Sequence, residues 1–213
     1  MTRDEETWQL VRAVDRMELV APRSTGALRL SLSLRQGAMA RRLAGARPSD
    51  ALPRAIGLHR RAPPTVFDAT AGLARDAMVL ARLGCQVTAV ERVPVLAFLV
   101  HEAARSASFA ARLSVLVGDA RDLLPKAAPP PQVVYLDPMF EHDSSAQVKQ
   151  EMQVCRLLAG GADDAGELFA IARQIASQRV VVKRHARQDP LAEPRSFVID
   201  GERVRFDVYL TAP

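Results

Sequence analysis

An alternation of short apolar segments with longer helix-like segments, between residues 65 and 183, most constrains the fold of this chain. The segments "TVFDA", "QVTAVE", "LSVLVGDA", "PQVVYLD" and "RVVVK" are rich in valine, which is typical of strands buried on both faces. Helices are expected between them at "GLARDAMVLARLG" and over residues 94–113, 144–159 and 163–178. This alternation predicts an α/β fold whose mostly parallel sheet is covered on both faces.

The end of the chain departs from the alternation. "RSFVIDGERVRFDVYL" reads as a closing β-hairpin with Asp200-Gly201 at its turn. One antiparallel strand is therefore expected at or near an edge of the sheet.

Residues 1–62 are expected to form a small N-terminal extension. The strands "MELVAP" and "ALRLSLSLRQ" flank the turn "RSTG", and the second has leucine at alternate positions, the period of a half-buried strand. We expect the basic segment that begins "GAMARRLAG" to be a loop, and residues 50–58 to form a short helix. "RRAPP" marks the boundary to a main domain of residues 63–213.

Composition narrows the class of protein. The net charge of +5 and the pI of about 9.8 favour an anionic partner such as nucleic acid. Cys85 and Cys155 lack the spacing of a metal site or a disulfide framework, and no metal is expected. Because the N-terminus lacks an apolar signal core and no apolar run approaches the length of a membrane span, we expect a soluble, cytoplasmic protein.

Charged residues follow the predicted strands. Asp68, Glu91, Asp119 and Asp137 each end a strand or follow it directly. In an open α/β sheet the ligand lies beyond the carboxyl ends of the parallel strands. A ring of carboxylates at that edge indicates a polar ligand with some positive charge.

The spacing of these acids favours S-adenosylmethionine over a nicotinamide dinucleotide. Glu91 lies 23 residues after Asp68, near the spacing at which an acid accepts hydrogen bonds from a ribose diol. The loop "DATAG" has one glycine, Gly72, whereas a pyrophosphate loop needs more. Asp76, at the start of the next helix, would repel a phosphate but would suit the amino group of a methionine moiety.

The fourth strand ends in Asp137-Pro138-Met139-Phe140. This sequence resembles the (Asp/Asn)-Pro-Pro-(Tyr/Phe) motif of methyltransferases that act on exocyclic amino groups of bases. A carboxylate and a backbone carbonyl that accept the two amine hydrogens localise the nitrogen lone pair toward the methyl donor, and the aromatic ring stacks on the base. Asp137, Pro138 and Phe140 are therefore the candidate catalytic residues.

Each acid also has a structural explanation. Asp76 could complement a helix dipole, Glu91 could be a solvated strand end, and Asp119 could cap the following turn. Asp137 could begin a turn, with Phe140 covering the core. Their joint occurrence at the expected positions favours a binding site.

Several segments resemble the RsmJ family, bacterial methyltransferases that modify guanine N2 at one site in 16S ribosomal RNA. They are "VFDATAGLARDAMVLARLGCQVTAVER", "PQVVYLDPMFEHDSSAQVKQEMQV", "RVVVKR", "GAMARRLAG", "PRAIGLH" and "RFDVYL". The resemblance implies a class I methyltransferase fold with a seven-stranded sheet, a reversed final strand and S-adenosylmethionine as donor. It also implies the small ribosomal subunit as partner, and neither a membrane nor an obligate protein partner is indicated.

The resemblance extends to individual residues. Asp137 would lie between donor and acceptor, and the donor would be contacted by Arg75, Asp76, Glu91, Arg92, Asp119 and Ala120. Asp68 and Gly72, from the loop after the first strand, and Asp137 itself complete the set of candidate donor-binding residues. The chain departs from the family pattern at Ala74, where a glycine is usual, at Glu141 in place of proline, and at Asp119-Ala120 in place of a serine pair. Its N-terminal extension is also shorter than the pattern.

Basic residues near the expected pocket are candidates for RNA contact. We expect Arg41-Arg42 to lie in a basic loop and Lys183-Arg184 at a strand end, and the full set is Arg35, Arg41, Arg42, Lys149, Lys183 and Arg184. Such contacts to phosphate position RNA without identifying its sequence.

Three other functions stay open at this stage. A nucleoside-binding dehydrogenase would bind NAD and should have more glycines after the first strand. A silent RNA-binding module would bind ribosomal RNA without product, although Asp137–Phe140 argues against it. An amino-methyltransferase of adenine or of DNA would use the same motif.

Overall fold

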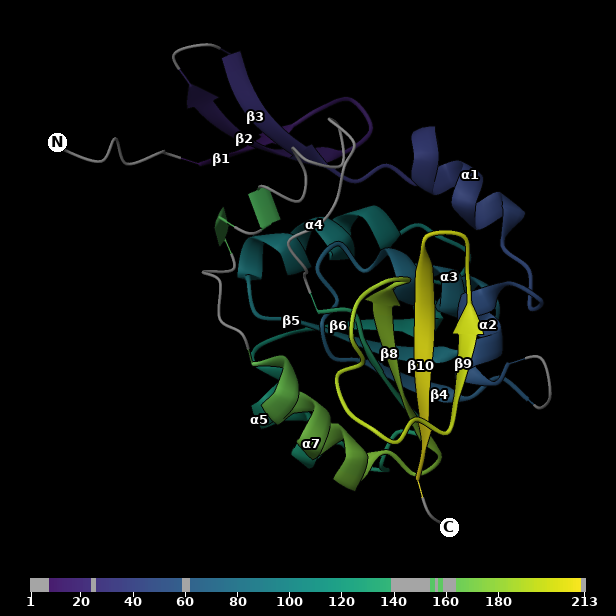
Figure 1. The fold of residues 1–213 in the computed structure, drawn as a ribbon. Coiled ribbons are helices and arrows are strands. Elements are labelled where there is room, and N and C mark those ends of the chain that lie inside the picture. The colour runs from purple at the N-terminus through teal and green to yellow at the C-terminus, as the bar shows by residue number, and fades with distance from the viewer. Residues whose placement is uncertain are drawn as a thin grey trace, which may run out of the picture.

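The main body of the molecule is a seven-stranded sheet with the order β6-β5-β4-β7-β8-β10-β9 (Figure 1). The computed structural model describes residues 8–23, 26–58, 62–138, 154–155, 157–158 and 164–211. The strands of the sheet are β4 (Thr65–Asp68), β5 (Gln86–Glu91), β6 (Leu113–Val117), β7 (Val133–Leu136), β8 (Arg179–His185), β9 (Phe197–Asp200) and β10 (Val204–Leu210). Strands β4 to β8 pair in parallel, and β10 is antiparallel to both of its neighbours. The expected parallel sheet with a reversed final strand is confirmed.

Helices cover both faces of the sheet. They are α3 (Arg75–Arg82), α4 (Pro94–Ala104), α5 (Ala120–Leu123) and α7 (Ala165–Ile175), with 3-10 turns η1 (Ala110–Arg112) and η2 (Leu124–Lys126). Alternate residues of β7 point to opposite faces, because successive side chains of a strand do so. Val133 and Tyr135 pack in the cluster that contains α3, whereas Val134 and Leu136 pack in the cluster that contains α7.

Two predicted helices are longer than the helices that the structure contains. Helix α4 ends at Ala104, well before residue 113, and the chain then forms a turn and the 3-10 helix η1. The predicted helix over 163–178 is present as α7. Most of the predicted helix over 144–159 lies outside the described residues.

The N-terminal extension contains a three-stranded antiparallel sheet and two helices. Its elements are β1 (Gln9–Arg12), β2 (Met17–Arg23), β3 (Gly26–Ser31), α1 (Gly37–Gly45) and α2 (Ala51–Ile56). The expectation of a loop at "GAMARRLAG" was wrong. Met39 and Leu43, one helical turn apart, bury the inner face of α1, and this burial stabilises a helix there.

The extension shares its core with the main body. Leu30 of β3 packs in one cluster with Leu96 and Leu99 of α4, and the small sheet lies beside that helix in Figure 1. The guanidinium Nη1 of Arg179 in β8 donates to the carbonyl oxygen of Ala55 in α2 at 3.2 Å. Helix α1 of the extension also contributes Arg42 to the site described below. Among the described residues, no helix is both long and apolar enough to cross a membrane.

Candidate active site

The loop after β4 is folded back against the neighbouring strands. The N–H of Ala69 donates to the Tyr135 carbonyl oxygen at 2.9 Å, and the N–H of Ala71 donates to that of Val90 at 3.0 Å. Gly72 has a φ of 54° and Ala74 a φ of 50°, both in the left-handed region. Glycine adopts that region freely, whereas alanine is strained there, which gives a physical reason for a glycine at the position of Ala74.

Glu91 holds two loops together at the end of β5. Its Oε2 accepts the N–H of Gly72 and its Oε1 accepts the N–H of Val93, each at 2.8 Å. Burial raises the pKa of Glu91, and these backbone donors oppose the rise. Because a carboxylate offers about four acceptor positions, Glu91 keeps capacity for the hydroxyls of a ribose.

Asp76 lies at the centre of a buried polar cluster. Its Oδ2 accepts the hydroxyl of Tyr135 at 2.5 Å and the ammonium of Lys183 at 3.1 Å. Its Oδ1 accepts a guanidinium N–H of Arg42, which comes from α1. Burial raises the pKa of Asp76, but the charges of Lys183 and Arg42 outweigh burial and hold the pKa well below its ordinary value. Asp76 is therefore an ionised carboxylate that already binds cationic groups.

Asp137 directly follows β7, and Lys183 lies beside it on the parallel strand β8, which continues to His185 beyond the strand end that we expected at Lys183. The register pairs Leu136 with Val182, so the next residue on each strand lies beside the other. The ammonium of Lys183 donates to Oδ2 of Asp137 at 2.7 Å, and the N–H of Asp137 donates to the hydroxyl oxygen of Thr70 at 2.6 Å. Partial burial raises the pKa of Asp137, and Lys183 opposes the rise.

Asp68 adds a third carboxylate to this end of the sheet. It is 2% exposed, and its Oδ1 accepts the N–H of Thr70 at 3.2 Å. Burial raises the pKa of Asp68 well above its ordinary value, and the negative charges of Asp76 and Asp137 raise it further.

The end of β6 forms the more open side of the site. The carboxylate of Asp119 caps α5 and accepts hydrogen bonds from the guanidinium of Arg121, whose Nη2 lies 2.7 Å from the Oδ2 of Asp119. These hydrogen bonds lower the pKa of Asp119 to about 2. Arg92 pairs with Asp164, before α7, at 3.0 Å. Ala120, the first residue of α5, is buried.

The structure places the predicted basic residues in three different environments. Arg35 and Arg41 are exposed, Arg41 on a helix rather than a loop. Arg42 and Lys183 reach inward to Asp76. Arg184 is buried and donates to the Asp189 carbonyl oxygen at 2.6 and 2.9 Å, which differs from the exposed cation that we expected.

Four predicted residues remain to be placed. Arg75 is the first residue of α3, and Pro138 is half-buried after Asp137. Phe140 and Lys149 lie outside the described residues.

The sequence analysis missed three residues that hydrogen-bond the acidic residues of the site: Tyr135, Thr70 and Arg121. Tyr135 is fully buried, and its position two residues before Asp137 puts both on one face of β7. A phenol within an otherwise aliphatic strand was the available signal, because a buried hydroxyl needs a polar partner. Burial and the charge of Asp76 raise the pKa of Tyr135, so the phenol remains a donor.

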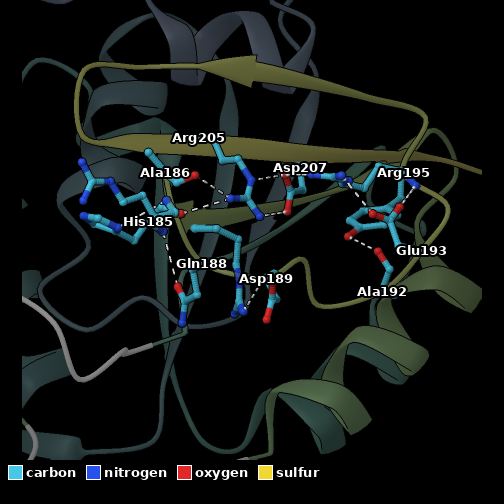
Figure 2. A network of polar contacts seen from close by, with 12 residues as sticks. His185, Ala186, Gln188, Asp189, Ala192, Glu193, Arg195, Arg205 and Asp207 are labelled. Atoms are coloured by element: carbon cyan, nitrogen blue, oxygen red, sulfur yellow. Dashed lines mark hydrogen bonds and ion pairs between the residues drawn. The ribbon is translucent and has the colours of Figure 1, made fainter.

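A second polar network fixes the end of β8 (Figure 2). The guanidinium of Arg205 donates to both carboxylate oxygens of Asp207 at 2.8 and 3.2 Å, and also to the carbonyl oxygens of His185 and Ala186 at 3.2 and 2.9 Å. Asp207 is fully buried and also pairs with Arg195. The network anchors the backbone directly after Lys183, which restricts where that side chain can lie.

The residues present fit S-adenosylmethionine chemically. Asp76 is a buried, ionised carboxylate suited to an ammonium group, and Glu91 is an acceptor suited to hydroxyls. The loop from β4 to α3 turns through Gly72, and nothing lies within 4 Å of the position that a side chain would take there. The edge of the sheet therefore places carboxylate acceptors beside a loop that turns at Gly72, and these groups suit the ammonium and hydroxyl groups of S-adenosylmethionine.

Comparison with known proteins agrees with this fold. The profile of a family described as "Putative SAM-dependent methyltransferase" matches residues 1–211. A crystal structure of a SAM-dependent methyltransferase from Neisseria gonorrhoeae is 32% identical, with a TM-score of 0.72 over 98% of this chain and 85% of that one. TrmN from Thermus thermophilus is 18% identical, with a TM-score of 0.53 over 88% of this chain and 56% of that one, a likeness of fold alone.

Sequence relatives are more specific. A protein of Thioalkalivibrio sulfidiphilus named ribosomal RNA small subunit methyltransferase J is 49% identical over 174 residues, 76% of this chain and 68% of the relative. One of the same name from Pseudomonas fluorescens is 38% identical over 203 residues, 91% of this chain and 78% of the relative. The chain therefore belongs to the ribosomal RNA small subunit methyltransferase J family of SAM-dependent methyltransferases, as its motifs predicted.

Proposed function

We propose that the protein methylates the exocyclic N2 amine of one guanine in 16S ribosomal RNA of the small ribosomal subunit. The observation that carries the proposal is the position of Asp137-Pro138 at the end of β7, beside the acidic end of β4 and β5. The family supplies the substrate class, since the relatives are named for small-subunit ribosomal RNA. A ribosomal substrate would place the protein in the cytoplasm.

Three acids would hold the donor. Asp76 would accept the α-ammonium of the methionine part, Glu91 the ribose hydroxyls, and Asp119 the adenine amino group. Gly72, Arg75, Arg92, Asp68 and Ala120 would complete the surroundings. When bound, S-adenosylmethionine supplies an electrophilic methyl group on a positively charged sulfur; the amine nitrogen forms the new bond to carbon, and the electrons of the broken bond remain on sulfur.

Asp137 would act on the acceptor amine. Its carboxylate would accept one amine hydrogen and the carbonyl of Pro138 the other, which directs the nitrogen lone pair away from the ring. Phe140 would stack on the base. A strong base is not needed before transfer, because the nitrogen becomes acidic only once it carries the methyl group, and its proton can then pass to Asp137 or to water.

The exposed cations would dock the RNA. Arg35 and Arg41 lie on the N-terminal extension, residues 1–62, which we propose as the RNA-facing part of the chain. Such phosphate contacts make affinity depend on salt.

Transfer of labelled methyl from S-adenosylmethionine tests the proposal. The purified protein is given small subunits and naked 16S RNA from cells that lack it, and the RNA is digested to nucleosides. Labelled N2-methylguanosine is the expected product. A labelled adenosine derivative would show that the base was misassigned. Absence of label from both RNA substrates, with label in a DNA substrate offered in parallel, would show that the nucleic acid was misassigned.

A further inference from the structure

Lys183 lies inside the site rather than on the RNA-facing surface. Its side chain is 23% exposed, against 43% for Arg42, and its ammonium bridges Oδ2 of Asp76 at 3.1 Å and Oδ2 of Asp137 at 2.7 Å. Among the described residues, it is the one side chain that hydrogen-bonds the carboxylate of Asp137. A lysine that docks phosphate would instead present its ammonium to solvent.

The charge balance around this ammonium explains why a cation is needed. Three carboxylates meet at the end of β4, the start of α3 and the end of β7. The charges of Asp76 and Asp137 raise the pKa of Asp68, and the charge of Asp76 raises the pKa of Asp137. Like charges that share a partly buried site favour protonation of one of them. The titratable and charged groups that face one another there are Asp68 of β4, Asp76 of α3, Tyr135 of β7, Asp137 after β7, Lys183 of β8 and Arg42 of α1.

Ionisation matters most at Asp137. A carboxylate accepts a hydrogen from an amine strongly, whereas a protonated carboxyl group presents a competing donor. Arg42, whose side chain is the more exposed of the two cations, contacts Asp76. Lys183 is the cation that contacts Asp137 directly.

We propose that Lys183 is a positioning residue for methyl transfer: its ammonium holds Oδ2 of Asp137 in place and keeps this carboxylate ionised, so that Oδ1 can accept the hydrogen of the acceptor amine. The inference rests on the proposed function, because it assumes that Asp137 meets an amine. Lys183 acts as a fixed charge and not as a base. The carboxylates around it raise the pKa of Lys183 despite burial, so the ammonium stays protonated and takes no proton from the product.

Substitution of Lys183 separates this role from RNA docking. We would compare Lys183→Met and Lys183→Arg with Lys126→Met, a matched loss of an exposed lysine in η2. In the ligand-free proteins, the carboxyl carbon of Asp137 is titrated by NMR. With S-adenosylmethionine and saturating ribosomal substrate, the single-turnover rate is measured against pH, and calorimetry gives the donor affinity.

The expected result is a defect in rate that depends on pH. Lys183→Met should move the titration of Asp137 to higher pH by about one pH unit or more. It should slow transfer near neutral pH by about 100-fold, of which at most about tenfold per pH unit of the titration shift is recovered as pH rises, and the rest reflects lost positioning. The KM for RNA, measured over a series of RNA concentrations, should change less than about threefold. Donor binding should persist because Asp76 remains, Lys183→Arg should recover most of the rate, and Lys126→Met should match the wild type.

Two results would overturn the inference. One is an unchanged titration of Asp137 in Lys183→Met, and the other is an unchanged rate with a raised KM for RNA, the signature of a phosphate contact. If Lys183→Met fails to fold, Lys183→Gln and Lys183→Arg carry the same comparison of neutral with charged side chains. Failure of the proposed function is a separate outcome, since it appears as a missing or different nucleoside in the wild-type assay, while the NMR titration still decides the role of Lys183.

Discussion

The carboxylates of the candidate site are held in place by two kinds of interaction, hydrogen bonds within nearby loops and ion pairs between distant parts of the chain. On the donor side, Glu91 is oriented by backbone N–H groups of Gly72 and Val93, and Asp119 by an arginine two residues away. On the acceptor side, Asp137 is oriented by Lys183, 46 residues away, and the same lysine also binds the donor-side Asp76, 107 residues away. Glu91 and Asp119 therefore depend largely on local chain geometry, whereas Asp76 and Asp137 depend on charges that only the assembled sheet brings together.

Loss of the carboxylate at 137 should have the largest effect. Asp137→Ala is expected to slow methyl transfer by about 1,000-fold, because it removes the acceptor for the amine hydrogen, while donor affinity remains near that of the wild type. Single-turnover kinetics and calorimetry measure the two quantities. Asp137→Asn keeps the size and one acceptor oxygen, and serves as the matched control. Activity of Asp137→Ala within about tenfold of wild type would remove Asp137 from the acceptor side.

Glu91→Ala should act on the donor side of the proposed site. It removes the expected acceptor for ribose hydroxyls, so the Kd for S-adenosylmethionine should rise about 10- to 100-fold. The N–H groups of Gly72 and Val93 also lose their partner, which should lower the free energy of unfolding by about 1–2 kcal/mol. Glu91→Gln should lose less of both. An unchanged Kd by calorimetry would mean that the ribose lies elsewhere.

The pH dependence of stability tests the crowding of carboxylates. The folded state raises the pKa of Asp68, so this group contributes stability below its unfolded pKa and loses that contribution as pH rises through its folded pKa. Asp68→Asn removes the charge and keeps an acceptor for the N–H of Thr70. It should therefore gain stability relative to wild type as pH rises from about 4 to about 8, by about 1 kcal/mol. Urea unfolding over that pH range measures the difference in free energy of unfolding between the two proteins. A difference that stays constant with pH would argue against repulsion among Asp68, Asp76 and Asp137.

The smallest effect should come from the loop itself. Ala74 has a φ of 50° at the start of α3. Ala74→Gly relieves the left-handed strain of about 1–2 kcal/mol and costs about 0.5–1 kcal/mol of backbone entropy, so the free energy of unfolding should rise by up to about 1 kcal/mol. Thermal unfolding would show a small rise in Tm with little change in donor affinity. Ala74 is buried in the core cluster that contains α3, so a fall in Tm would mean that packing of its methyl group contributes more than the left-handed strain costs.

The secondary structure of the main body was largely readable from the chain. The apolar runs predicted β4 to β8 because strands buried on both faces need continuous apolar sequence, and "QVTAVE" matches β5 residue for residue. Strand β1 escaped because all four of its residues are exposed, so it lacks the alternation that marks a half-buried strand. Helix α1 escaped because only Met39 and Leu43 mark its buried face.

The sequence by itself determined the fold class, the family and the acids at the strand ends, since these depend on local periodicity and on motifs contiguous in the chain. Only the tertiary structure decided the partners of those acids. Lys183 read as a surface cation because a lysine at a strand end is ordinarily solvated, and its neighbour Arg184 read the same way. The order and register of β7 and β8 put Lys183 against Asp137 and Asp76, and the network of Arg205 and Asp207 fixes the strand end that carries it. Electrostatic pairing depends on distance in space, which separation along the chain does not specify.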